Sequence, residues 1–253
     1  MPCGAMILAA GRGERMRPLS DTTPKPLLEV GGKPLIVWQI EALARAGFRR
    51  IVINAAHLAD VLVARLGDGA KFGVRIGWSI EPEALETAGG IATALPLLPP
   101  GPALIVSADI HTRFDYATLR PRIEAMARDP RPPRVHLVMV PNPPYHPGGD
   151  FGLVPEPMAA NGFGARIARD GGMRLTFGNI GLYDTALFAE LPRFTKLKLL
   201  PLYHRWIAEG WVSGERFDGP WANVGTPADL DQLNAAQTPA TTIAPQGANT
   251  NRP

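Results

Sequence analysis

Short apolar runs alternate with helical stretches through the first hundred residues, and this alternation constrains the fold more than any other feature. The runs that predict buried strands are residues 6–10, 50–54, 74–80 and 103–106. Between them, apolar side chains recur at helical spacing in residues 34–47, 58–66 and 91–98. Successive strand–helix repeats are typical of an α/β domain, so we expect a mostly parallel central sheet flanked by helices on both faces.

The rest of the chain has a less regular pattern. Further strands are expected at residues 135–140 and near Phe151, Leu175 and Tyr183, and helices at 199–207 and 227–233. We expect one domain over residues 1–235 and a disordered tail over residues 236–253. The tail is rich in Ala, Thr, Pro, Gln and Asn and carries one charge, so it cannot bury enough apolar surface to fold.

Composition narrows the function classes. The 253 residues are 45% hydrophobic, which is enough for a large core. The formal net charge is only +3 and the basic residues are scattered, so we expect no nucleic-acid partner, whereas a mildly basic surface suits small phosphorylated anions. A single cysteine, Cys3, excludes an internal disulfide. With no apolar run of membrane-spanning length and no leader pattern, we expect a cytoplasmic protein with no membrane partner.

Three candidate ligand-binding positions follow predicted strands: the loop starting at Gly11, the segment starting at Asn54, and Asp109. In α/β sheets, ligands bind outside the carboxyl ends of the strands. The Gly11 loop reads Gly-Arg-Gly-Glu-Arg, a composition that lets backbone N–H groups approach phosphate oxygens. The dinucleotide fingerprint would require a small residue where Met16 stands, so a nicotinamide-linked dehydrogenase is a poor match.

The loop and its continuation resemble a known signature. Residues 8–18, Leu-Ala-Ala-Gly-Arg-Gly-Glu-Arg-Met-Arg-Pro, are followed by Pro-Lys-Pro at 24–26, and together they resemble the sugar-1-phosphate nucleotidyltransferase family. Shorter segments are similar to the branch of that family that uridylylates N-acetylmuramate 1-phosphate; they are residues 85–91, 150–151, 198–202, 212–215 and 221–226. The resemblance spans roughly residues 5–233. It implies a Rossmann-like nucleotidyltransferase fold.

The resemblance also implies a reaction. A sugar 1-phosphate would attack the α-phosphorus of UTP and release pyrophosphate, giving UDP-N-acetylmuramate for peptidoglycan recycling. A phosphate monoester is already anionic at neutral pH, so the reaction needs positioning and charge stabilisation rather than a strong base. Arg15 and Lys25 are suitable cations: by resemblance Arg15 would hold the triphosphate and Lys25 would bridge the reacting phosphates. Without the motif, both could be ordinary solvated charges.

Asp109 is the predicted Mg²⁺ ligand, because it follows an apolar strand and its carboxylate would lie at the ligand-binding edge of the sheet. The resemblance supports this, since relatives use this aspartate for the metal. The alternative is a turn aspartate that bonds its own backbone. Two residues depart from the family pattern. Ala108 stands where relatives usually carry Gly, and Asn223 stands where they commonly carry a second metal-binding aspartate. An asparagine oxygen can ligate Mg²⁺ without bringing charge, so we expect a site that needs more Mg²⁺.

The remaining site residues are also implied by resemblance. The nucleotide-binding set comprises Ala10, Gly11, Gly13, Asn54, Glu86 and Gly90, in which Glu86 would accept a hydrogen bond from N3–H of uracil. Guanylyltransferase relatives usually carry Gly in place of Glu86, which could instead be a helix first-turn acid. The sugar-phosphate-binding set comprises Asp150, Gly152, Asn179 and Lys198. Asn179 could equally form a tight bend, and Lys198 could be a surface charge.

Two other functions remain open at this level. One is a mannose- or heptose-1-phosphate guanylyltransferase, which keeps the chemistry and changes both substrates. The other is a catalytically silent nucleotide-sugar sensor, which the departures at Ala108 and Asn223 would suit. We expect UTP and a sugar 1-phosphate as small-molecule partners, and a monomer or a small homo-oligomer.

Overall fold

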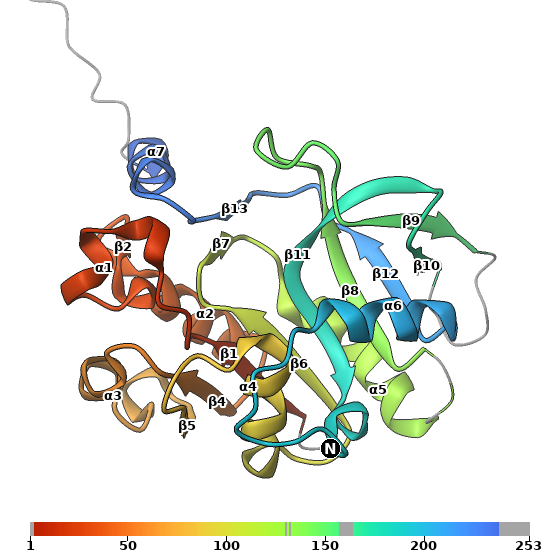
Figure 1. Cartoon of the computed structure of the whole chain (residues 1–253), viewed down its shortest axis with the longest axis horizontal. Coiled ribbons are helices and arrows are strands. Elements are labelled where there is room, and N and C mark those ends of the chain that lie inside the picture. The colour runs from red at the N-terminus through yellow and green to blue at the C-terminus, as the bar shows by residue number, and fades with distance from the viewer. Residues whose placement is uncertain (1–2, 130, 132, 157–163, 238–253) are drawn as a thin grey trace, which may run out of the picture.

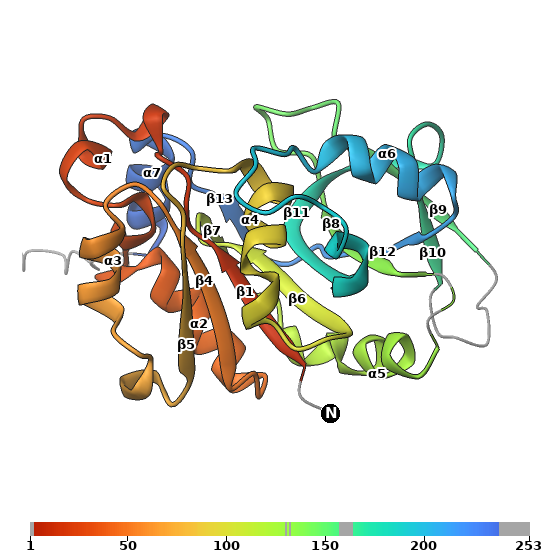
Figure 2. The same cartoon turned by 60° about the horizontal axis from the view of Figure 1, so that its bottom comes forward.

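A nine-stranded sheet forms the centre of the molecule (Figure 1). The structure is a computed structural model that describes residues 3–129, 131, 133–156 and 164–237. One half of the sheet is wholly parallel, in the order β5 (Arg75–Ile80), β4 (Arg50–Ala55), β1 (Gly4–Leu8) and β6 (Pro102–Ser107). Figure 2 shows these four strands side by side. Their apolar sequences suit burial on both faces.

The other half of the sheet is mixed. Its strands, in order, are β11 (Met173–Asp184), β8 (Val135–Val140), β12 (Val212–Arg216), β10 (Ala165–Ala168) and β9 (Phe151–Pro155). β11 is antiparallel to both β6 and β8, whereas β12 is parallel to β8. β9 also pairs with the first residues of β11, so these five strands close into a ring. The expected α/β fold is confirmed, and its sheet is mixed.

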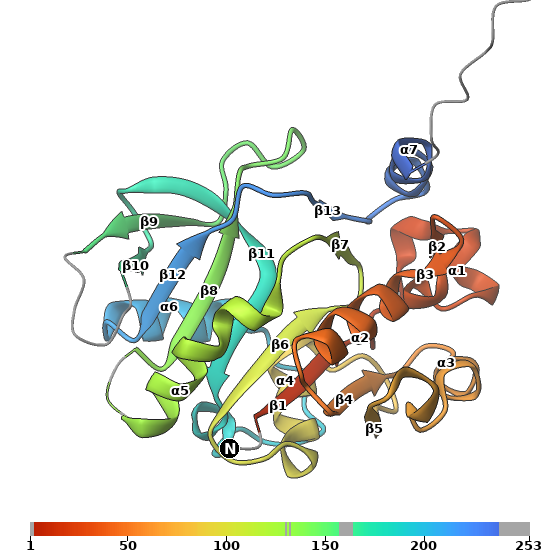
Figure 3. The same cartoon turned by 180° about the vertical axis from the view of Figure 1, so that it is seen from behind.

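Helices cover both faces of the sheet. On one face lie α2 (Leu35–Arg45), α3 (Ala59–Leu66) and α5 (Arg120–Arg128), and on the other lie α4 (Glu86–Ala94) and α6 (Leu200–Ala208). Figure 3, seen from behind, shows α2 and α5 in front of the sheet, whereas α4 and α6 lie in front in Figure 1. Neighbouring residues of β1 pack into opposite cores: Ile7 packs on the side of α2, α3 and α5, and Met6 on the side of α4 and α6.

A third, small core lies beside the carboxyl end of β1. β2 (Glu29–Val30) and α7 (Pro227–Gln237) contribute side chains to it. The other short elements are α1 (Leu19–Thr22), β3 (Lys33–Pro34), which pairs with β2, and the paired strands β7 (Ile110–Thr112) and β13 (Trp221–Asn223). Met16, Val224 and Leu230 are buried together in this core. The last elements of the chain therefore pack beside the loop that follows the first strand.

Several element boundaries differ from the predictions. The helix expected at residues 91–98 begins earlier, at Glu86, and ends at Ala94, while the strands expected near Leu175 and Tyr183 are one long strand, β11. α7 continues to Gln237, so residues 236 and 237 are helical, and the rest of the predicted disordered tail lies outside the described residues. No helix in the described part of the chain is long and apolar enough to cross a membrane.

Candidate active site

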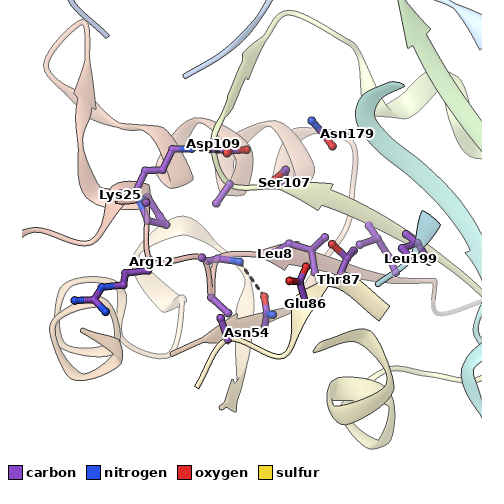
Figure 4. A pocket seen from close by; sticks show the side chains of 18 of the residues that line it. Leu8, Arg12, Lys25, Asn54, Glu86, Thr87, Ser107, Asp109, Asn179 and Leu199 are labelled. Carbon is purple, nitrogen blue, oxygen red and sulfur yellow. Dashed lines mark hydrogen bonds and ion pairs between the residues drawn. The ribbon is translucent and has the colours of Figure 1, made fainter. Parts of the chain in front are cut away.

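A pocket of about 780 Å³ opens at the carboxyl ends of β1, β4 and β6. The loop of residues 9–15 forms one wall, and Lys25, Asp109 and Gly225 continue it. Figure 4 places Arg12 and Lys25 at one end of the pocket and Leu199 at the opposite end, with Glu86 and Thr87 between them. The size suits a nucleotide together with a second small substrate.

The loop after β1 is shaped to present backbone groups and cations. Gly13 has a φ of 67°, which glycine adopts without steric cost, and it leads into a single 3₁₀ turn, Glu14–Met16. Met16 is buried against Val224 and Leu230, which anchors the turn from below. Arg15 lines the pocket, and a β-carbon added to Gly225 would lie 3.3 Å from its guanidinium. Gly225 thus leaves room for the Arg15 side chain.

Lys25 and Asp109 form an ion pair inside the pocket. The Lys25 Nζ atom lies 2.5 Å from Asp109 Oδ2, and the two side chains are 11% and 27% exposed. Partial burial of both charges requires this mutual compensation. An ammonium group has three N–H donors, so the pairing with Asp109 leaves two for phosphate oxygens.

Asn223 supplies a candidate second metal ligand next to Asp109. It lies in β13 opposite Ile110, and the N–H of Val224 donates to the Asp109 carbonyl over 2.9 Å. The Asn223 Oδ1 atom is buried and accepts no hydrogen bond from the described residues. A carboxylate and an unpartnered amide oxygen are donors that Mg²⁺ prefers, so this corner fits the ion with phosphate and water oxygens completing its shell.

Tyr145 approaches the same corner from the connection between β8 and β9. Partial burial raises the pKa of its phenol, the carboxylates of Asp229 and Asp109 raise it further, and the neighbouring amide of Asn223 and the charge of Arg15 lower it. The phenol therefore lies close to both candidate metal ligands.

Glu86 lines the middle of the pocket with an unusual backbone conformation. Its φ is 61°, in the left-handed region that glycine favours, and it is the first residue of α4. A side chain held there costs about 1 kcal/mol of conformational strain. Such strain at an exposed carboxylate inside a pocket is more typical of a binding residue than of a helix first-turn acid.

A buried hydrogen-bond network holds the wall around Glu86. Asn54 Oδ1 accepts from the N–H of Ala9 over 2.9 Å, and Asn54 Nδ2 donates to Glu81 over 2.7 Å. The second oxygen of Glu81 accepts from the N–H of Leu85 over 3.0 Å. Burial raises the pKa of the Glu81 carboxyl, opposed by these two hydrogen bonds. Glu81 thus ties the loop after β1 to the turn that presents Glu86.

Asn179 and Asp150, two of the residues predicted to bind the sugar phosphate, lie on or beside β11. Asn179 has a φ of 57°, which asparagine tolerates, and its side chain lines the pocket where β11 shifts register (Figure 4). Asp150 bonds the N–H of Phe177 over 2.8 Å and lies 3.2 Å from His146, so it holds the connection before β9 against β11.

Comparison with known proteins identifies the family. A family model described as nucleotidyl transferase matches residues 4–155, which include the loop of residues 9–15, Lys25, Glu86 and Asp109. The chain belongs to the nucleotidyl transferase family. The predicted resemblance to sugar-1-phosphate nucleotidyltransferases is confirmed.

Two relatives match nearly the whole chain. One is the N-acetylmuramate alpha-1-phosphate uridylyltransferase of Neisseria meningitidis serogroup B, 45% identical over 91% of this chain and 96% of that protein. The other is the protein of the same name from Caulobacter vibrioides, 34% identical over 88% and 92%. A Bacillus anthracis structure assigned as a glucose-1-phosphate thymidylyltransferase shares the fold, with a TM-score of 0.75 at 22% identity over 93% and 95%.

The structure of this nucleotidyl transferase brings most of the predicted site residues to one pocket. Those that line it are Arg15, Lys25, Asp109, Ala10, Gly11, Gly13, Asn54, Glu86 and Asn179. Those that do not line it are Gly90, Asp150, Gly152, Lys198 and Asn223. The predicted roles in catalysis and binding stay predictions.

Two of the residues outside the wall have a packing explanation. A β-carbon on Gly90 would lie 2.8 Å from Asn54 Nδ2 and 2.9 Å from Glu81 Oε1, so this glycine leaves room for the buried network. A β-carbon on Gly152 would overlap the carbonyl of Gly171. Lys198 is exposed. Sequence reasoning could not separate glycines that approach a ligand from glycines that approach another chain segment.

Sequence reasoning missed the floor of the pocket. Phe177, Tyr183 and Tyr203 line it, together with the apolar side chains of Ile91, Ile105 and Leu199. Tyr183 and Tyr203 are buried and their phenol oxygens are hydrogen-bonded to each other. No local sequence signal pairs them, because one lies in β11 and the other in α6.

Proposed function

We propose that this nucleotidyl transferase moves a uridylyl group from UTP to N-acetylmuramate 1-phosphate and releases pyrophosphate. The observation that carries the proposal is a single pocket that joins Arg15, Lys25 and Asp109 at one end to the strained Glu86 in its middle. The full-length likeness to two uridylyltransferases supports the choice of substrates. The product would serve peptidoglycan recycling in the cytoplasm.

The reaction is a displacement at phosphorus. An oxygen of the sugar phosphate forms a bond to the α-phosphorus of UTP, the bond from that phosphorus to the oxygen bridging to the β-phosphorus breaks, and its electron pair leaves with pyrophosphate. Arg15 and the backbone N–H groups of residues 9–15 would bind the triphosphate. Lys25 would donate its two remaining N–H groups to the reacting phosphates, offsetting their mutual repulsion.

We also propose that the reaction depends on Mg²⁺. Asp109 and Asn223 would hold the ion, which when bound supplies positive charge to the phosphate oxygens. Asp109 provides the one full negative charge of this ligand pair, and Asn223 adds a neutral oxygen that has no other partner among the residues the structure describes. Glu86 would accept the N3–H of uracil, which distinguishes uracil from cytosine because cytosine has no proton at N3.

A product assay tests the proposal. The protein is incubated with Mg²⁺, each of four nucleoside triphosphates and a panel of sugar 1-phosphates, and pyrophosphate and the nucleotide sugar are measured. We expect pyrophosphate with UTP and N-acetylmuramate 1-phosphate. Exclusive use of GTP with mannose or heptose 1-phosphate would replace the uridylyl assignment.

Asp109→Asn separates the enzyme from a silent sensor. In an enzyme this change removes most of the turnover, whereas a sensor has no turnover to lose in the wild-type protein. Arg49→Gln, an exposed arginine outside the pocket, is the control that we expect to retain full turnover.

A further inference from the structure

The floor of the pocket contains two phenols that share one hydrogen bond. Tyr183 and Tyr203 are 2% and 5% exposed, and both line the pocket. Burial raises the pKa of each phenol well above its usual value, so both are protonated at neutral pH. Two phenols carry two protons, and the bond between them uses one.

The second phenol proton has no acceptor among the described residues. Neither the Tyr183 nor the Tyr203 phenol group has another hydrogen-bond partner in the part of the chain that the structure describes. Burying a hydroxyl donor without a partner is unfavourable, typically by 1–3 kcal/mol on protein scales. A molecule in the pocket that carries a hydrogen-bond acceptor would satisfy this donor.

The surroundings of the phenols are apolar and rigid. Ile91, Ile105 and Leu199 are 0%, 3% and 7% exposed and line the same floor. A β-carbon on Gly181 would lie 2.7 Å from the Tyr183 phenol oxygen, so this glycine is what lets the Tyr183 ring fold back along β11. Tyr203 packs edge-on against Phe177, with ring centroids 5.9 Å apart. The donor is therefore presented at a fixed place beside apolar walls.

The floor lies at the sugar side of the pocket. Phe177 donates its backbone N–H to Asp150, and the Asp150 carboxylate is close enough to raise the pKa of Tyr203. Leu199 lies at the end of the pocket away from Arg12 and Lys25 (Figure 4). A sugar whose phosphate is held near Lys25 would extend its substituents toward this floor.

We propose that Tyr183 and Tyr203 form a recognition subsite for an acetamido substituent of the sugar, an inference that rests on the proposed function. An acetamido group combines a carbonyl acceptor with a methyl group, which matches one free donor beside apolar walls. A hydroxyl in the same place could accept the hydrogen bond, but it has no methyl group to pack against the apolar side chains of the floor. A carboxylate would be buried without a cation, so the lactyl group of N-acetylmuramate would stay nearer the mouth.

The test compares two competitors that differ only in this substituent. N-acetylglucosamine 1-phosphate and glucose 1-phosphate are measured as competitive inhibitors of the wild-type reaction with N-acetylmuramate 1-phosphate. We expect the acetamido compound to bind about tenfold more tightly in the wild-type protein. In the double variant Tyr183→Phe/Tyr203→Phe this ratio should fall by about three- to tenfold, the effect of one hydrogen bond between uncharged groups.

The double variant removes both oxygens, so it leaves no phenol unpaired in the core. Tyr116→Phe is the matched control, because Tyr116 is equally buried, bonds Gln39 and does not line the pocket. We expect the control to keep the wild-type ratio. If the double variant keeps the wild-type ratio of the two inhibition constants, and the wild-type protein turns over N-acetylmuramate 1-phosphate, the proposed subsite is wrong and the proposed function stands. A wild-type protein that does not use N-acetylmuramate 1-phosphate would overturn the proposed function and the subsite with it.

Discussion

At the scale of single residues, the backbone of Glu86 links stability to specificity. A glycine at a φ of 61° relieves the strain of a side chain, so we expect Glu86→Gly to stabilise the protein by up to about 1 kcal/mol. The same change removes the proposed uracil contact, so KM for UTP should rise about tenfold, the effect of roughly 1.4 kcal/mol. Urea unfolding and initial rates measure the two effects.

Phe194→Gly is the control for this prediction. Phe194 has a φ of 55°, is exposed, and lies outside the pocket wall. We expect it to show the backbone effect on stability with an unchanged KM for UTP. If Glu86→Gly behaves like Phe194→Gly in both measurements, Glu86 does not contact the base.

A second prediction for a single residue concerns Asn223 and the Mg²⁺ dependence of the reaction. Asn223→Asp should lower the Mg²⁺ concentration for half-maximal rate several-fold, because a carboxylate adds charge where a buried amide oxygen has no partner. Without Mg²⁺ the variant should be less stable than the wild type, since a second carboxylate then lies beside Asp109. Asn179→Asp adds a carboxylate at another position of the pocket wall and serves as control. An unchanged Mg²⁺ titration with intact activity would show that Asn223 is not a ligand.

Some site residues could be predicted because their signal is contiguous. Arg15 and Lys25 belong to one stretch of chain, and each lines the pocket. Glu81 and the Tyr183–Tyr203 pair could not be predicted, because their roles depend on which segments fold against them. Glu81 is an ordinary acidic residue in the sequence, and only its burial and its two hydrogen-bond donors reveal its function in the wall.

At the scale of elements, Glu81 joins the end of β1, β4 and the turn before α4. Its pKa in the folded protein is raised above the ordinary 4.5, mainly by burial. The folded state therefore binds the proton more tightly than the unfolded state, so this stabilising contribution is complete below about pH 4.5 and is lost as pH rises through the raised pKa. As the pH rises from about 4.5 through the raised pKa, we expect the free energy of unfolding to fall less in Glu81→Gln than in the wild type.

Urea unfolding at a series of pH values measures this difference. Glu124→Gln, an exposed carboxyl on α5, is the control and should keep the wild-type pH dependence. Parallel curves for Glu81→Gln and the wild type would show that Glu81 does not titrate differently on folding.

Element prediction succeeded in the parallel half of the sheet for a physical reason. There, each strand and the helix that covers it are consecutive in sequence, so the apolar pattern reports both. In the mixed half, β12 pairs with β8 across more than seventy residues, and β10 has only four residues. α5 was not predicted, because its residues are mostly polar and it buries one side chain, Met126; the ion pair of Arg122 with Glu215 holds it to β12.

At the scale of the whole molecule, the pocket lies where the two halves of the sheet meet. The parallel half contributes the loop of residues 9–15 and Asp109, whereas the mixed half contributes Phe177, Asn179 and Tyr183. A nucleotide sugar that fills the pocket would therefore contact both halves, whereas UMP alone would contact chiefly the parallel half. Binding to the folded state alone stabilises a protein by mass action, by about 2.7 kcal/mol at a hundredfold excess over Kd.

This arrangement predicts unequal thermal shifts. For a chain of this length about 1 kcal/mol corresponds to roughly 2–4 °C in Tm, so saturating UDP-N-acetylmuramate with Mg²⁺ should raise Tm by about 5–10 °C, and UMP or N-acetylmuramate 1-phosphate should raise it less. Amide exchange should slow in residues 9–15 and in β11 together with the nucleotide sugar, whereas UMP alone should slow it chiefly in residues 9–15. Arg15→Ala removes an exposed cation of the phosphate end and should reduce the shift at equal ligand concentration. An equal shift in this variant, or protection confined to one half of the sheet, would show that the product does not span the pocket.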